Sequence, residues 1–145
     1  MGQMGMELNF SFALVTFLMV LPGNEAACKK PSKAVASTTL KGELWTFAVW
    51  YPVPIHMGIC KHSKYPDPNK RRPKSDRYSI IIATDDKNYV MEYTCIDTGI
   101  QPRIETVVYT KKQKLRPAVI KEIESAHTEV GLDKAKIWYC IYQKI

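Results

Sequence analysis

The sequence has little of what most enzymes and membrane proteins need. Its three histidines, His56, His62 and His127, lack the spacing of metal ligands. It has no glycine-rich phosphate loop and no nucleophile elbow around a serine. Its apolar stretch Phe10–Leu21 is shorter than the roughly 20 residues that span a bilayer. We therefore expect a protein that is not an enzyme, with no catalytic residues, no metal or other cofactor, and no transmembrane segment in the mature chain.

The N-terminal segment has the layout of a secretory signal peptide. The apolar stretch Phe10–Leu21 is followed by the helix breaker Pro22-Gly23 and then by small residues. We predict that residues 1–27 are a signal peptide and that residues 28–145 form one extracellular domain. A signal anchor is the alternative, because Glu7 is the only charged residue before the apolar stretch.

The charge of the chain is basic but mostly dispersed. Lys and Arg total 21 against 14 acids, which gives a net charge of +7. This surplus is too scattered for a nucleic-acid interface, and we expect no nucleic-acid partner. One run, Lys61–Arg77, is dense, and a secreted basic loop can bind heparan-type polyanions or acidic lipid surfaces. The candidate residues are Lys70, Arg71, Arg72 and Lys74. A solvated loop is the alternative interpretation.

Four cysteines, Cys28, Cys60, Cys95 and Cys140, are spread over the chain after the signal peptide. None lies close enough to another for a zinc knuckle or a thioredoxin-type pair. In an oxidising compartment they predict two disulfides, and their spacing leaves all three possible pairings open.

Alternating apolar and aromatic residues predict an antiparallel sheet followed by one helix and a last strand. The predicted strands are Leu44–Tyr51, Arg77–Thr84, Tyr89–Cys95, Ile104–Thr110 and Lys136–Tyr142. Turn-forming residues join the three central strands into a meander. The helix runs from Pro117 to Val130, where apolar residues recur at helical spacing. Pro117 suits its first position, and Gly131 suits the position just after its end.

Three segments carry motifs in a familiar order. Gly42-Glu-Leu-Trp45 has a G-x-W-like pattern with the tryptophan one place late. Ala83–Cys95 contains a T-D turn and a strand that ends in cysteine, and Val108–Pro117 is a strand leading to a helix. Together these segments resemble the three motifs of the lipocalins, most closely of the apolipoprotein D-like branch. In that family tyrosine is usual at the position of Asp86, and arginine at that of Lys111.

The resemblance implies an all-β fold, an antiparallel up-and-down barrel with one C-terminal helix packed outside. Only the charged, proline-rich run 61–76 stands where the family's middle strands belong, so we expect an incomplete barrel. The resemblance also implies the disulfides Cys28–Cys95 and Cys60–Cys140. It places Gly42, Trp45 and Lys111 at the barrel floor, with the lysine lying across the tryptophan ring.

The resemblance implies a carrier or sequestering protein for a small hydrophobic ligand, such as a lipid, sterol, retinoid or bilin. The residues expected to line its pocket are Phe47, Val49, Tyr51, Val107 and Tyr109. In a small barrel such side chains can instead fill a solid core, and that alternative stays open.

Two glutamates offer a second ligand class. Glu105 shares a strand face with Val107 and Tyr109, and the family pattern turns Glu92 inward as well. Such a pair would attract a cationic ligand such as a biogenic amine. Periodicity argues the other way for Glu92, because Tyr89, Met91 and Tyr93 form the more apolar face and can be buried under the helix.

Overall fold

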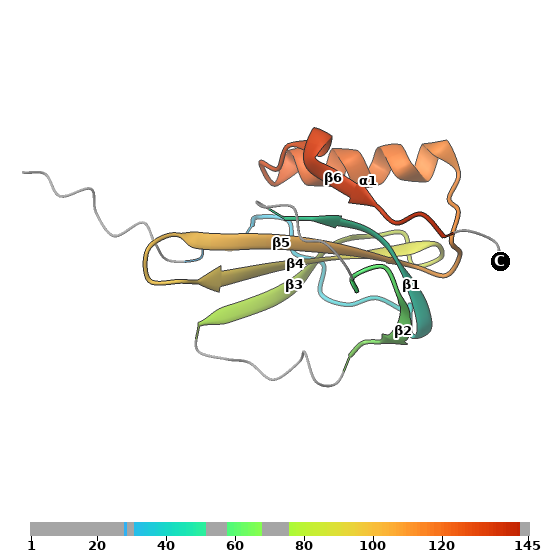
Figure 1. The fold of residues 1–145 in the computed structure, drawn as a ribbon, viewed down its shortest axis with the longest axis horizontal. Helices are drawn as coiled ribbons and strands as arrows, with labels where there is room; N and C mark the ends of the chain where they lie inside the picture. Colours follow the sequence, from blue (N-terminus) through green and yellow to red (C-terminus); the bar gives the residue numbers. More distant parts are fainter. Residues whose placement is uncertain (1–27, 29–30, 52–57, 68–75, 143–145) are drawn as a thin grey trace, which may run out of the picture.

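The computed structural model describes residues 28, 31–51, 58–67 and 76–142 of the chain. One antiparallel sheet holds six strands: β1 (Gly42–Trp50), β2 (His62–Tyr65), β3 (Arg77–Thr84), β4 (Tyr89–Asp97), β5 (Pro102–Thr110) and β6 (Ile137–Tyr139). Their order is β2-β1-β5-β4-β3, and β6 pairs with β1. Helix α1 (Pro117–Glu129) lies over one face of the sheet, and the short helix η1 (Lys134–Lys136) leads into β6 (Figure 1).

The sheet curls without closing. Strands β2 and β6 pair with the same edge of β1, at Gly42–Trp45 and at Ala48–Trp50 respectively. Strand β3 forms the opposite end of the sheet, and in the described part of the chain no strand bridges β2 to β3. The expected incomplete barrel with one helix outside is therefore what the structure contains.

Strand β2 corrects one expectation from the sequence. The run 61–77 is predicted as a basic loop, but its first part pairs with β1 from Gly42↔Tyr65 to Trp45↔His62. Tyr65 is buried while Lys64 stays exposed, so half of this short strand faces the core despite its charges. The last strand is shorter than predicted: the expected strand Lys136–Tyr142 is only Ile137–Tyr139 in the structure.

The helix-side face of the sheet carries the main hydrophobic core. Tyr89, Met91 and Tyr93 of β4 all lie in this core, together with Val119 and Ile123 of α1. The apolar stripe of β4 is thus buried under the helix, as its periodicity suggests. As predicted, the helix begins at Pro117, and Gly131 lies just after its end with φ +79°, a conformation that favours glycine.

A buried histidine fixes α1 to β5. His127 is 0 % exposed, and its Nδ1 lies 2.7 Å from the carbonyl oxygen of Ile123. Because a carbonyl only accepts, Nδ1 carries the proton, and Nε2 accepts from the Thr106 hydroxyl at 2.7 Å. Burial lowers the pKa of His127, although the hydrogen bond to Ile123 and the charge of Glu124 act in the opposite direction.

This histidine predicts a pH dependence of stability. Below about pH 6.5 an unfolded histidine takes up a proton, whereas the buried ring, with its lowered pKa, stays neutral. The free energy of unfolding should therefore fall as the pH drops from 7.5 to 5.5. Urea unfolding at both pH values measures this, and His127→Gln should flatten the slope. An equal slope in both proteins would contradict the assignment.

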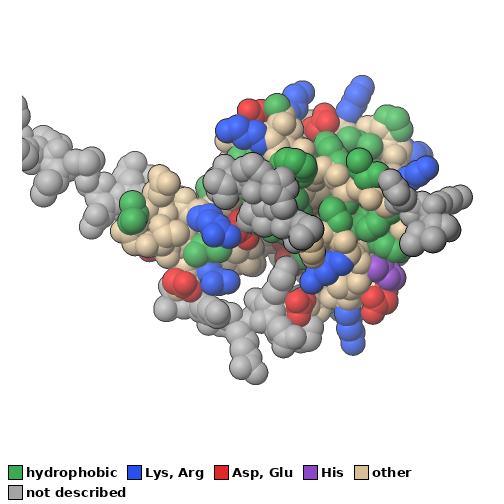
Figure 2. All heavy atoms as spheres, in the orientation of Figure 1, with side chains coloured by type: hydrophobic (Ala, Val, Ile, Leu, Met, Phe, Trp, Pro, Cys, Tyr) green, Lys and Arg blue, Asp and Glu red, His purple; other side chains and the backbone are tan. Residues whose placement is uncertain are grey.

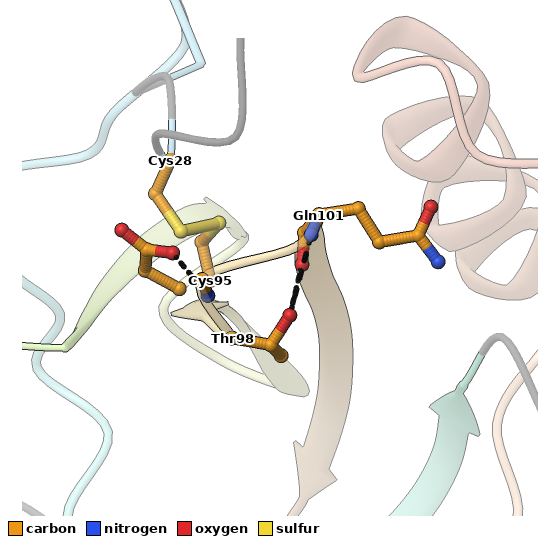
Figure 3. The surroundings of a disulfide bond; sticks show 6 residues. Cys28, Cys95, Thr98 and Gln101 are labelled. Carbon is orange, nitrogen blue, oxygen red and sulfur yellow. Dashed lines mark hydrogen bonds between the residues drawn. A yellow bond between two sulfur atoms is a disulfide. The ribbon is translucent and has the colours of Figure 1, made fainter. Parts of the chain in front are cut away.

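Both disulfides implied by the resemblance are present. Cys28 pairs with Cys95, and Cys60 pairs with Cys140. Figure 3 shows the first bond beside the β4–β5 turn, where the Thr98 hydroxyl donates to the carbonyl oxygen of Gln101 at 2.6 Å. The bond therefore anchors Cys28 at the end of the sheet where β4 turns into β5. Two disulfides fit an extracellular protein.

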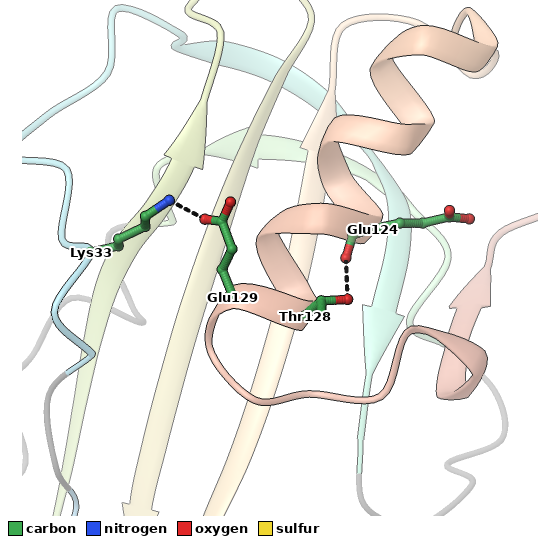
Figure 4. Close-up of polar contacts among 4 residues, drawn as sticks. All are labelled: Lys33, Glu124, Thr128 and Glu129. Carbon is green, nitrogen blue, oxygen red and sulfur yellow. Dashed lines mark hydrogen bonds and ion pairs between the residues drawn. The ribbon is translucent and has the colours of Figure 1, made fainter.

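The segment 31–40 passes along the edge of β3, from the helix side of the sheet to its opposite face. On the helix side, Lys33 forms an ion pair with Glu129 near the end of α1 (Figure 4). The same view shows Thr128, whose hydroxyl donates to the Glu124 carbonyl oxygen at 3.2 Å. Further along, the N–H of Val35 donates to the carbonyl oxygen of Ile81 at 2.8 Å, which places the segment along the edge of β3.

Candidate functional site

The sheet face opposite α1, called the inner face below, carries a second and smaller apolar cluster. Its buried members are Leu40, Leu44, Tyr65, Val90 and Tyr109, and Ile81 and Val107 pack against them. These residues come from five strands and from the segment 31–40. The strand register explains the grouping, because side chains of directly paired residues point to the same face.

Two adjoining cavities open on this face. One has a volume of about 470 Å³ and the other about 300 Å³, and Ala36, Tyr65 and Ile81 line both of them. The larger cavity also touches Leu40 and Pro66, and the smaller touches Ser79 and Glu92. Such volumes are in the range of small-molecule sites, which are mostly apolar with a few polar groups. We refer to the two together as the inner cavity.

The wall of the inner cavity is held in place by a turn. Asp86, at φ +59°, is the second residue of the β3–β4 turn, and its Oδ1 accepts from the Thr38 hydroxyl at 2.7 Å and from the Thr39 N–H at 3.0 Å. These bonds, led by the one from Thr38, lower the pKa of Asp86. Asp85 builds the turn itself, accepting from the N–H groups of the next residues, including Asn88 at 2.7 Å. The segment 31–40 is thus fixed against the sheet at this end.

Polar groups on the inner face sit beside tyrosines. Glu105 accepts from the guanidinium of Arg103, with Nε at 2.8 Å, so its charge is compensated. Glu92 lines the cavity and has no cationic partner among the described residues. Burial raises the pKa of Tyr109, and the nearby Glu92 carboxylate raises it further, so the phenol stays protonated.

Tyr51 follows the end of β1 and is half-buried. Burial raises the pKa of its hydroxyl, and the Glu105 charge adds to this while Arg103 opposes it. The hydroxyl is therefore a neutral hydrogen-bonding group near Glu105.

The structure places most of the predicted pocket residues on the inner face. Val49 pairs with Val107, Glu92 also pairs with Val107, and Glu105 pairs with Thr94. Tyr109 is buried in the inner cluster. These residues are therefore on one face; their contact with a ligand stays a prediction.

Phe47 corrects the predicted pocket. The register of β1 against β5 shifts between Thr46 and Ala48, and Phe47 lies in the helix-side core. The extra residue of a β-bulge lets neighbouring side chains point to the same side and reverses the alternation that follows. Phe47 contacts Tyr139 edge-on, with ring centroids 5.8 Å apart, and is no part of the inner cavity.

The predicted barrel-floor residues are arranged differently from the expectation. Trp45 stacks on His62 with centroids 4.2 Å apart and meets Tyr142 edge-on at 4.7 Å. Lys111 is exposed, and its backbone N–H donates to the Asn88 carbonyl oxygen at 3.2 Å. The ring contacts of Trp45 are thus aromatic, on the helix side of the sheet. Gly42 has φ +101°, which explains the glycine at the start of β1.

Several residues of the inner cavity escape the sequence analysis. Ala36 and Leu40 belong to a segment with no strand pattern, and Tyr65 lies in the charged run. Trp138 pairs with Val49, which places it on the inner face at the edge of the sheet, and it is 55 % exposed. Figure 2 shows green hydrophobic side chains over the region where β6 crosses this view. The alternation in 77–84 could have identified Ile81, but the other positions needed the fold.

Some predictions fall outside the described residues or concern absences. The signal peptide 1–27 and the basic candidates Lys70, Arg71, Arg72 and Lys74 lie outside the described ranges. Within those ranges, no group of three or more His, Cys, Asp or Glu side chains is placed to hold a metal ion. Nor does any helix among the described residues have the length and apolar character to cross a membrane.

The chain matches no protein-family model and no curated protein. Its fold is nevertheless similar to solved structures. H1 crustacyanin from the lobster Homarus americanus aligns with a TM-score of 0.51 and 16 % identity, over 75 % of this chain and 80 % of that one. The siderocalin Ex-FABP, which functions through dual ligand specificities, aligns with a TM-score of 0.50 and 9 % identity, over 72 % and 95 %. At these identities the likeness concerns the fold alone: an antiparallel sheet that curls without closing, with one helix packed outside.

Proposed function

We propose that this chain is a secreted, lipocalin-like binding protein that carries or sequesters a small hydrophobic molecule. The observation that carries the proposal is the inner cavity, an apolar hollow lined by Leu40, Tyr65 and Ile81 on the face where lipocalin-like sheets enclose their interior. Lipids, sterols, retinoids and bilins all fit an apolar site of this size. The likeness to crustacyanin and to a siderocalin with dual ligand specificities supports a binding function.

A cationic ligand group is a second candidate, favoured by one observation. Glu105 is already paired with Arg103, whereas Glu92 faces the cavity without a cation among the described residues. Glu92 is only partly buried, and a carboxylate without a cationic partner among the described residues attracts a positive group, because partial burial leaves less water to screen its charge. The amine of such a ligand would therefore lie at Glu92 and not between the two glutamates.

The proposal predicts binding that is visible in tryptophan fluorescence. Titration with palmitate, retinol, biliverdin and serotonin should give a saturating change with at least one probe. By register, Trp138 is on the inner face, while Trp45 and Trp50 point to the helix side, where Trp50 Nε1 donates to the Asp133 carbonyl oxygen at 2.9 Å. Trp138 is on the same face as the inner cavity but does not line it, so Trp138→Phe should reduce the signal while calorimetry still detects binding.

The same titration separates the two ligand classes. If serotonin binds, Glu92→Gln should weaken it about tenfold, whereas Glu105→Gln, the matched control on the neighbouring strand, should change affinity by less than about threefold. If no probe binds more tightly than about 100 μM, roughly −5.5 kcal/mol, the proposed function is wrong.

A further inference from the structure

A dense group of cations lies at the end of the sheet where β5 leads into α1. Within six residues the chain places Lys111, Lys112, Lys114 and Arg116, and all four are exposed. The backbone N–H of Lys111 donates to Asn88, the neighbour of exposed Lys87 in the β3–β4 turn, so the turn adds a fifth cation. We call these five residues the basic end.

The basic end lacks internal compensation. None of its five cations is in an ion pair among the described residues. Two nearby acids, Asp85 and Asp86, are occupied by hydrogen bonds within the turn and to the segment 31–40. These two carboxylates reduce the local positive charge but leave a clear excess of it.

The placement of the basic end also acts against the stability of α1. Cations are unfavourable at the N-terminus of a helix, where the helix dipole is positive. Here Arg116 is the N-cap, no side chain caps the first turn, and the first turn has no acid. The acids of the helix, Glu122, Glu124 and Glu129, come later instead. A charge arrangement that opposes the helix is explained if it serves an external anion.

We propose that the basic end binds a sulfated polysaccharide of the heparan type. Five exposed cations on two adjoining loops match a flexible chain of sulfate groups, which offers charge without a fixed shape. A membrane is the weaker fit, because the exposed large hydrophobic side chains that could insert into lipid are elsewhere, at Val35, Ile100, Trp138, Tyr139 and Ile141. The basic end also holds no aromatic residue on which a nucleic-acid base could stack.

This surface is separate from the inner cavity, so its function goes beyond the proposed ligand binding and does not depend on it. It is also distinct from the run Lys70–Lys74, which the sequence analysis considered for the same kind of partner. Bound through the basic end, the protein would be retained near cell surfaces while its cavity stays open. The two activities can therefore be tested independently.

The test uses the full secreted chain and a heparin octasaccharide. The variant Lys111→Gln/Lys112→Gln/Lys114→Gln/Arg116→Gln removes four cations. A matched control is Lys64→Gln/Lys121→Gln/Lys134→Gln/Lys136→Gln. It removes four other exposed lysines, so its net charge equals that of the first variant. Calorimetry at 150 mM NaCl should show that the first variant weakens binding at least about 100-fold and the control less than about fivefold. The slope of log Kd against log salt should also decrease by about 3 in the first variant alone.

Two results would overturn the proposal. One is an equal loss in both variants, which would indicate a nonspecific effect of net charge. The other is a loss only when Lys70, Arg71, Arg72 and Lys74 become alanine, which would move the site to that run. Vesicles of phosphatidylserine and phosphatidylcholine provide a further arm, and binding to them more tightly than to heparin would assign the surface to membranes instead.

Single substitutions at Arg116 check that the first variant loses heparin affinity because cations are removed and not because the protein unfolds. Arg116→Asp supplies a capping carboxylate at the helix N-terminus, so it should raise the melting temperature while lowering heparin affinity. Arg116→Gln should lower heparin affinity with a smaller thermal effect. Weaker heparin binding in a protein that is more stable cannot be caused by unfolding. If Arg116→Asp keeps wild-type heparin affinity, the N-cap residue is not part of the site.

Discussion

Replacing Cys60 and Cys140 together by alanine should lower the free energy of unfolding by about 4 kcal/mol. The two cysteines are separated by 80 residues, so their bond removes much of the freedom of the unfolded chain. In the folded protein it joins Cys60, two residues before β2, to Cys140, the residue after β6, and these two strands pair with the same edge of β1. The loss is a large share of the roughly 5 to 15 kcal/mol that stabilises an ordinary domain.

Urea unfolding of the variant under non-reducing conditions measures this loss. The pair Cys28 and Cys95 serves as a comparison, because its separation of 67 residues predicts almost the same chain-entropy effect. Similar losses in both double variants would agree with stabilisation through the unfolded state. A loss below about 1 kcal/mol for Cys60→Ala/Cys140→Ala would contradict the claim that this disulfide stabilises the fold.

Ile123→Ala should destabilise the protein by about 3 kcal/mol. Ile123 is 0 % exposed and packs in the helix-side core together with Met91 and Val108. Removing a fully buried branched side chain loses its transfer free energy and leaves a cavity, which together amount to about 2 to 5 kcal/mol. The exposed neighbour Lys121 provides the control, because Lys121→Ala should change stability by less than about 0.5 kcal/mol.

The same variant separates the two faces of the sheet. Ile123 lies on the helix side, whereas the inner cavity lies on the other side. At a temperature where Ile123→Ala remains folded, its affinity for a bound probe should therefore stay within about twofold of wild type. A large loss of affinity in the folded variant would show that the cavity depends on the helix-side core.

The central part of the fold could be predicted from local pattern. Strands β3, β4 and β5 and helix α1 have strong periodicity and clear turn residues, and their observed bounds lie close to the predicted ones. The pattern of β4 also indicated that Tyr89, Met91 and Tyr93 pack under the helix, and they do. The disulfide pairing could not be obtained from spacing, and only the family resemblance implied it.

The errors arise where distant parts of the chain meet. The bulge that turns Phe47 toward the helix depends on how β1 pairs with β5, and alternation within β1 cannot reveal it. Strand β2 forms inside a charged run because β1 offers it an edge, so pairing overrides composition. The segment 31–40 has no regular pattern, yet its bonds to Asp86 make it a wall of the cavity.

Calorimetric titration of Ile81→Glu with a probe that binds the wild-type chain tests the central claim most directly. Ile81 lines both parts of the inner cavity, so a carboxylate there would have to lose water against an apolar ligand. The control is Ile100→Glu, the same substitution at a side chain that is 89 % exposed in the β4–β5 turn. We predict at least about a 50-fold loss of affinity for Ile81→Glu and no change for Ile100→Glu. Wild-type affinity in a folded Ile81→Glu protein would contradict the claim that the inner cavity is the binding site.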